Sequence, residues 1–161
     1  MRLMTTSDRG RQLIKRYEGL RLSAYVCPAG RLTIGWGHTR GVCAGQRITE
    51  QQAEAMLTAD TAPIEQLLNA LGINFRQEQF DALVSWIFNL GYGNFSHSTL
   101  LKRIQAGASD EEIADQMVRW TFAGGRQLRG LMERRVSEAN TFVGRERYRV
   151  EGGKIVKTAG A

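Results

Sequence analysis

The first helix that the sequence predicts ends in a glutamate that could act as an acid. Apolar residues recur at helical spacing up to Tyr17, and Gly19 is a typical residue just past a helix end. Glu18 therefore closes this helix, where the negative end of the helix dipole and apolar neighbours both disfavour a charged carboxylate. A carboxylic acid that keeps its proton near neutral pH can protonate a leaving oxygen. The alternative is an ordinary solvated glutamate.

A second group of candidate residues lies in segment 33–39, TIGWGHT. Gly35 and Gly37 alternate with larger residues, which indicates the close approach of another part of the chain or of a ligand. His38 could serve as a base. A lone histidine at a strand end is more often a structural hydrogen-bonding partner, and we favour that interpretation.

The cysteines do not indicate a disulfide framework or a metal site. There are two, Cys27 and Cys43, and they lack the CxxC spacing of zinc and redox sites. A single bridge between them is possible but not implied. No other spacing of histidine, cysteine and acidic residues predicts metal ligands, so we expect neither a metal nor a cofactor.

The spacing of three candidate residues matches a known enzyme family. Eight residues separate Glu18 from Cys27, and five separate Cys27 from Thr33. This spacing resembles the catalytic pattern of phage lysozymes of glycoside hydrolase family 24, which includes the T-even phage lysozyme. The flanking text EGLRLSAYVCPAGRLTIGWGHT resembles the active-site hairpin of that family. WIFNLGYGNFSHSTLL, VRW and RGLMERRVSEANTF resemble its central helix and C-terminal lobe. The resemblance covers residues 8–144.

The resemblance implies a role for each of the three residues. Glu18 would be the general acid, and Thr33 would help to hold the attacking water. Cys27 stands where many members have Asp, as a base, a charge stabiliser or a nucleophile. A thiol fills the first two roles only as a thiolate, and attack by sulfur would replace inversion with retention. Cys27 could instead be a small buried apolar side chain, but at this spacing we favour a catalytic or site-lining role.

Three later residues match positions that line the family's substrate groove, namely Phe88, Asn89 and Ser98. By position alone, Phe88 is better explained as a core aromatic residue. Asn89 is more informative, because a polar side chain near the end of an apolar helix needs a partner. Arg134 and Arg135 could face the cleft or the anionic wall, or could belong to a solvated helix face.

The elements around these residues predict an α+β, lysozyme-like fold. Between Leu20 and Gly45, frequent glycines and alternating apolar residues predict two or three short antiparallel strands with a tight turn at 28–30. Thr49 followed by Gln52 forms a capping box that opens a helix.

We expect a single domain and a monomer. Its small antiparallel β lobe would span about 20–48. A larger all-helical lobe would span about 50–144 together with the N-terminal helix 7–19. In this lobe we expect one helix that ends at about 71, a second that starts near Asn74, and two more at about 110–119 and 131–143. The polar tail, 145–161, would form a small hairpin or remain loose.

The composition limits the classes of partner that this protein could bind. The 161 residues are 42% apolar and 24% charged, with a formal net charge of +6, which suits a soluble globular protein with an anionic partner. No aromatic residues interleave with a dense basic stripe, so we disfavour nucleic acid. No apolar run is long enough for a signal peptide or a membrane anchor, so we expect no stable membrane insertion. The resemblance then implies residence in the host cytoplasm until a phage holin gives access to the wall.

We therefore predict an endolysin, an N-acetylmuramidase that hydrolyses the β-1,4 bond between N-acetylmuramic acid and N-acetylglucosamine in bacterial peptidoglycan and lyses the host. Three alternatives stay open. One is a catalytically weak or inactive lysozyme-fold protein that binds the cell wall, which the cysteine at position 27 keeps in play. The others are a basic nucleic-acid-binding domain, whose affinity would depend strongly on salt, and a chitin-cleaving glycosidase.

Overall fold

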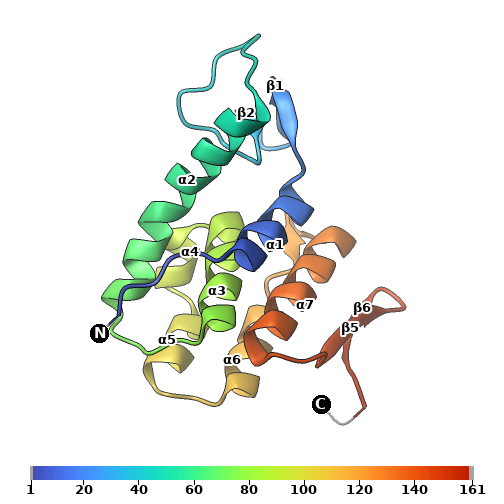
Figure 1. Cartoon of the computed structure of the whole chain (residues 1–161). Coiled ribbons are helices and arrows are strands. Elements are labelled where there is room, and N and C mark those ends of the chain that lie inside the picture. The colour runs from blue at the N-terminus through green and yellow to red at the C-terminus, as the bar shows by residue number, and fades with distance from the viewer. Residues whose placement is uncertain (1, 160–161) are drawn as a thin grey trace.

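The structure, a computed structural model, describes residues 2–159 and consists of a small β lobe joined by a long helix to a larger helical lobe (Figure 1). The predicted α+β class is confirmed. The elements are α1 (Asp8–Glu18), β1 (Arg21–Val26), β2 (Leu32–Gly35), α2 (Glu50–Ala70), α3 (Gln77–Leu90), α4 (Tyr92–Ser96), α5 (Thr99–Gln105), α6 (Asp110–Met117), β3 (Phe122–Ala123), β4 (Arg126–Gln127), α7 (Arg129–Val143), β5 (Tyr148–Glu151) and β6 (Lys154–Lys157).

Local capping signals explain where several helices begin. The Ser7 side chain accepts a hydrogen bond from a backbone amide in the first turn of α1. Thr49 and Gln52 form the predicted capping box at α2, and Ser109 and Glu112 form another at α6. Each bond satisfies an amide that a helix end leaves without a partner.

The start of α3 differs from the prediction. Arg76, not Asn74, is the N-cap, and its amide donates to the Gln79 side chain at 2.9 Å. Phe75, one residue before the cap, is only 8% exposed and packs into the core. Burying this ring holds the chain non-helical past Asn74, so the helix begins later than the capping signal suggested.

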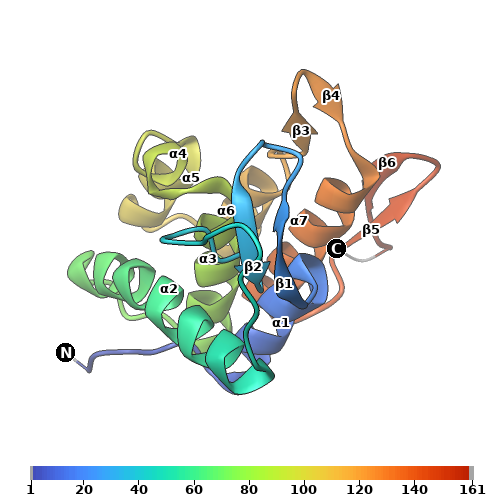
Figure 2. The same ribbon diagram turned by 90° about the horizontal axis from the view of Figure 1, so that it is seen from above.

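The β lobe is a hairpin with a third segment along its edge. Strands β1 and β2 are antiparallel, with Tyr25 opposite Thr33 and Val26 opposite Leu32. Segment 46–48 runs beside β1 and exchanges two backbone hydrogen bonds of 2.9 Å with it. Seen from above, α1 leads directly into β1, so the last residue of α1 lies where the two lobes meet (Figure 2).

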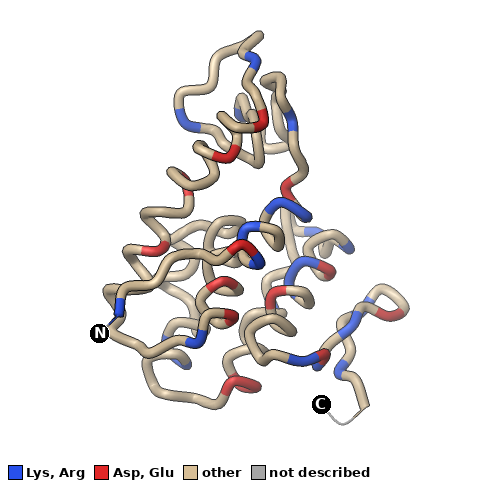
Figure 3. The backbone as a smooth tube through the Cα atoms, viewed as in Figure 1, with Lys and Arg blue, Asp and Glu red and all other residues tan. Residues whose placement is uncertain are grey.

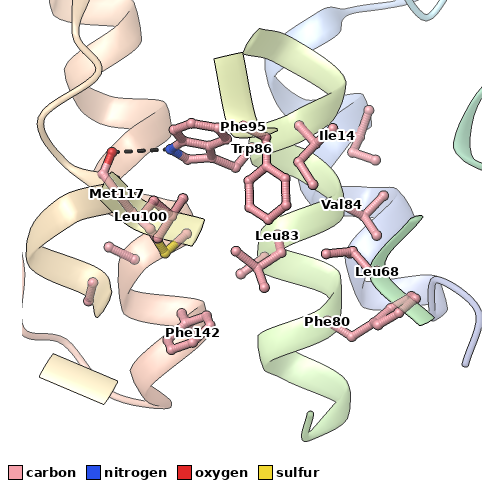
Figure 4. Close-up of a cluster of buried hydrophobic side chains, with 14 of the residues drawn as sticks. Ile14, Leu68, Phe80, Leu83, Val84, Trp86, Phe95, Leu100, Met117 and Phe142 are labelled. Carbon is pink, nitrogen blue, oxygen red and sulfur yellow. Dashed lines mark hydrogen bonds between the residues drawn. The ribbon is translucent and has the colours of Figure 1, made fainter. Parts of the chain in front are cut away.

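Helix α3 is the buried centre of the larger lobe, as predicted. Its residues from Gln79 to Ile87 are all buried, and it packs against α1, α2, α4 and α7. The Trp86 indole donates to the Met117 carbonyl at 3.2 Å among the apolar side chains of the core (Figure 4). Trp86 also makes an edge-to-face contact with Trp120, with ring centroids 5.3 Å apart. This packing fixes the C-terminal end of α3, where Asn89 lies.

The larger lobe is not all-helical, which corrects the prediction. The hairpin β3–β4 interrupts it, and α4 and α5 occupy a region where no helix was expected beyond the central one. The tail forms the hairpin β5–β6, one of the two predicted outcomes. Tyr148 is 2% exposed and donates to the Asp115 carboxylate, and this hydrogen bond anchors the hairpin to the lobe.

Charge is distributed over both lobes. Lysine and arginine occur in the β lobe, in α1, in α7 and in the C-terminal hairpin, interspersed with acidic residues (Figure 3). None of the helices within residues 2–159 combines the length and the apolar character needed to cross a membrane.

Candidate active site

Glu18 lies at the junction of the lobes and contacts both. Its Oε2 accepts a hydrogen bond from Nη1 of Arg134, on α7, at 2.5 Å, and the two side chains are 19% and 4% exposed. On the other side is Gly37, whose φ is +76° and where an added Cβ would lie 2.6 Å from Glu18 Oε1. The close approach predicted from the glycine pattern is therefore to the carboxylate of Glu18.

Arg134 changes the electrostatics expected at this helix end. Its guanidinium forms an ion pair with the carboxylate at the end of α1. The prediction considered the helix dipole and apolar neighbours alone, because α7 is more than a hundred residues away in the chain.

A hollow of about 360 Å³ opens beside Glu18, a volume within the range of small-molecule sites. Its lining residues are Tyr17, Glu18, Asn89, Leu128, Gly130, Leu131 and Arg134. A larger hollow of about 800 Å³, with Arg9, Gln77 and Arg145 in its lining, includes none of the predicted site residues. We assign the candidate active site to the smaller hollow, because the acid and its guanidinium partner lie there.

Cys27 and Thr33 come together in the β hairpin. Cys27 directly follows β1, and Thr33, in β2, is 3% exposed. Hydrogen bonds to the cysteine sulfur from the Thr33 hydroxyl and from the backbone of Arg31 lower the pKa of Cys27. The Thr33 hydroxyl can alternatively donate to the Arg31 carbonyl, 3.0 Å away. The hairpin thus favours the thiolate that the predicted roles require, and Cys27 and Cys43 are both free thiols.

The three predicted substrate-binding residues lie in different environments. Asn89 is exposed and lines the hollow, and its Oδ1 accepts from Arg135 Nη2 at 2.7 Å. Phe88 is half-buried and packs against the core. Ser98 is 3% exposed, and its hydroxyl caps α5 and donates to a backbone carbonyl at 2.6 Å. Of the three, the structure brings only Asn89 to the hollow beside Glu18.

His38 is held in a structural pair. Its Nδ1 lies 2.8 Å from Asp60 Oδ2, and its Nε2 lies 2.8 Å from the Arg40 carbonyl oxygen. Both ring nitrogens therefore have partners within the protein, in agreement with the structural role that we favoured.

Sequence reasoning missed two buried residues behind the site, Glu138 and Ser85. Glu138 is 0% exposed and accepts from Arg134 Nε at 3.1 Å and from Ser85 Oγ at 2.5 Å. The spacing Arg134, Arg135 and Glu138 places charged residues three and four positions apart on one helix, which brings them together. That spacing is the signal that could have revealed the cluster. Within residues 2–159, no three side chains of the metal-ligating types gather into a site.

Comparison with known proteins identifies the family. The family model described as Phage lysozyme matches residues 15–138, a span that includes Glu18, Cys27 and Thr33. The chain belongs to the phage lysozyme family. It is 44% identical over 144 residues to the endolysin of Acyrthosiphon pisum secondary endosymbiont phage 1, covering 86% of this chain and 98% of that protein.

Solved structures agree with the family. The muramidase domain of SpmX from Asticaccaulis excentricus is 40% identical, with a TM-score of 0.80 and coverage of 86% of this chain and 97% of that one. The endolysin from Escherichia coli O157:H7 phage FAHEc1 is 36% identical, with a TM-score of 0.77 and coverage of 87% and 94%. These likenesses confirm the lysozyme-like fold, and membership of the phage lysozyme family makes the chain a glycoside hydrolase.

Proposed function

We propose that this phage lysozyme is an endolysin that cleaves the β-1,4 bond between N-acetylmuramic acid and N-acetylglucosamine in peptidoglycan. The observation that carries the proposal is the Glu18 carboxyl group, which lines a hollow of the helical lobe and lies between the Arg134 guanidinium and Gly37 of the β lobe. The endolysin and muramidase names of its relatives support the substrate.

Glu18 supplies the proton in this proposal. As the bond from the anomeric carbon to the glycosidic oxygen breaks, Glu18 donates its proton to that oxygen, and the leaving sugar departs as an alcohol. A bound glycan that displaces water from the hollow makes a charge on Glu18 more costly, and so favours the protonated acid that the step needs.

Cys27 and Thr33 serve the attacking water. Water adds to the anomeric carbon from the opposite face and loses a proton to the Cys27 thiolate. The Thr33 hydroxyl donates to that thiolate, and a hydroxyl can also accept from the water. Direct attack by water gives inversion. Attack by the thiolate on carbon would give retention, and the anomer first formed, read by NMR, separates the two.

Asn89, which lines the hollow, is our candidate for binding the glycan. Phe88 and Ser98 stay predictions from family resemblance, since neither lines the hollow in the structure. Alanine at Asn89 is expected to raise KM, whereas Ser98→Ala is expected to act mainly through stability, because the Ser98 hydroxyl caps a helix.

We also propose that the enzyme waits in the host cytoplasm and reaches the wall through an opening made by a phage holin, as a monomer without a nucleic-acid partner or a stable membrane insertion. The endolysin relatives support action at the wall. Fractionation of host cells before and after membrane permeabilisation tests the route, and sedimentation tests the monomer.

The test of function is product analysis on purified peptidoglycan. Borohydride reduction of the new ends should yield muramitol, which identifies the cleaved bond. Glucosaminitol would contradict the proposed bond. Binding to peptidoglycan with no new reducing ends would instead indicate a wall-binding protein. Clearing of permeabilised Gram-negative cells by the wild-type protein, with Glu18→Gln beside it, extends the test to the cell.

A further inference from the structure

Behind Glu18 lies a buried cluster of charges with one carboxylate at its centre. Glu138 is fully buried and pairs with Arg134, which is 3% exposed, and with Arg135, which is 0% exposed. Burying ions costs free energy that their mutual attraction often only just offsets, so such a cluster is weak evidence for stability. Its members also contact residues outside the core.

Arg134 reaches the acid. Its Nε donates to Glu138 Oε2 at 3.1 Å, and its Nη2 donates to the Ser85 carbonyl at 3.2 Å. Both contacts are buried, and together they fix the plane of the guanidinium. The remaining nitrogen, Nη1, then points at Glu18 Oε2. The position of Arg134 is therefore set from within the core and does not depend on its contact with Glu18.

Arg135 reaches the candidate binding residue. Its Nη2 lies 3.4 Å from Glu138 Oε2 and donates to Asn89 Oδ1 at 2.7 Å. Because the amide oxygen of Asn89 faces this cation, the NH₂ group of Asn89 stays available as a donor. A donor at this place suits an acceptor oxygen of a glycan, such as an acetamido carbonyl.

We propose that Glu138 is a positioning residue for glycan cleavage, holding Arg134 against the acid Glu18 and Arg135 against the binding residue Asn89. The proposal rests on the proposed function of the site. When Glu18 and Glu138 are both ionised, their charges balance those of the two arginines. When Glu18 takes up a proton, Glu138 remains as the counter-ion of Arg134, so the acid can be neutral without leaving that buried cation unpaired.

The charged residues that the contacts place at Glu18 lie on α7. Arg134 is in contact with that carboxylate, and Arg135 and Glu138 lie behind Arg134. The β lobe presents Gly37 to the carboxylate. The other residues around the hollow carry no formal charge at neutral pH: Tyr17, Asn89, Leu128, Gly130 and Leu131.

The first test is the kcat for reducing-end release by folded variants. Glu138→Gln removes the carboxylate that accepts from Arg134 Nε, so Arg134 loses its fixed orientation toward Glu18 and kcat should fall about tenfold or more.

The control is Asp81→Asn. Asp81 is a second carboxylate at 2% exposure, bonded to Ser7 and Gln77 away from the hollow. This variant should be destabilised while its kcat stays near wild type. Glu138→Asp keeps the charge but shortens the side chain that reaches Arg134, so kcat should fall less than in Glu138→Gln, and it serves if Glu138→Gln does not fold.

The second test is the split between KM and kcat on peptidoglycan fragments. Arg135→Lys keeps the charge but loses the guanidinium nitrogen that donates to Asn89, so KM should rise about five- to tenfold with kcat little changed. Asn89→Ala should raise KM to a similar extent, and the double variant should be no worse than either single variant, since both remove one interaction.

The results separate the two proposals. If the wild type and Glu18→Gln release reducing ends equally slowly, the proposed function fails. If the wild type is active but the kcat of folded Glu138→Gln matches that of Asp81→Asn, the positioning role fails. Additive rises in KM for Arg135→Lys and Asn89→Ala would likewise overturn it.

Discussion

Substitution of Gly37 by alanine should disable the acid while leaving the rest of the fold in place. The added Cβ would lie 2.6 Å from Glu18 Oε1, so this oxygen must withdraw by about 0.8 Å to reach the 3.4 Å of ordinary contact. Its partner oxygen is held by Arg134, which is held in turn from within the core. Glu18 therefore cannot move aside without disturbing its ion pair.

The magnitude follows from that displacement. A misplacement of about 1 Å at a reacting group can cost on the order of 100-fold in rate, so Gly37→Ala should lower kcat by roughly 50- to 100-fold. The backbone adds a separate cost. Gly37 has a φ of +76°, and a residue with a Cβ pays about 1–2 kcal/mol there.

Gly41 in the same loop supplies the matched control. Its φ is +68°, and an added Cβ would meet no atom within 4 Å. Gly41→Ala should therefore lose similar stability in thermal unfolding while its initial rate of reducing-end release stays near wild type. If Gly37→Ala retains activity within about threefold of Gly41→Ala, the close contact does not position the acid, and the reasoning fails.

Two further predictions concern the thiol and the C-terminal hairpin. The Thr33 hydrogen bond is the largest cause of the lowered pKa of Cys27, so Thr33→Val should raise the pH at which the thiolate forms. In a Cys43→Ala background, alkylation of Cys27 by iodoacetamide near pH 7.5 should therefore slow roughly two- to fivefold. Unchanged alkylation would count against the hydrogen bond. Burial and the bond to Asp115 raise the pKa of Tyr148 to about 12, so Tyr148→Phe should lower the unfolding free energy by about 1–2 kcal/mol at pH 8. The pKa of Tyr148 is higher in the folded than in the unfolded protein, so its stabilising contribution is complete below pH 10 and is lost as the pH rises to about 12. Plots of unfolding free energy against pH for the wild type and the variant should therefore converge there.

Local signals in the sequence were enough to locate the hairpin and the acid. Gly19 ends α1 directly after Glu18, with a φ of +71°, and the turn at 28–30 brings Cys27 and Thr33 into neighbouring positions. These features depend on residues close together in the chain, so turn and capping chemistry predicts them.

The guanidinium at the acid had no such local signal. Arg134 and Glu18 are 116 positions apart, and only the packing of α1 and α3 against α7 brings them together. At Asn74 a local signal was present but misleading. Its capping signal predicted the start of a helix, but Phe75 is buried and α3 begins after Arg76. Tertiary packing decided both outcomes, and no window of the sequence contains that information.

The central claim is that Glu18 is the proton donor for glycan cleavage, and the most direct test compares the wild type with Glu18→Gln on purified peptidoglycan. The amide keeps the size of the side chain but has no acidic proton, so the rate of reducing-end release should fall by about a thousandfold while the melting temperature stays close to wild type. If folded Glu18→Gln releases reducing ends at the wild-type rate, Glu18 is not the acid, and the account of this site is wrong.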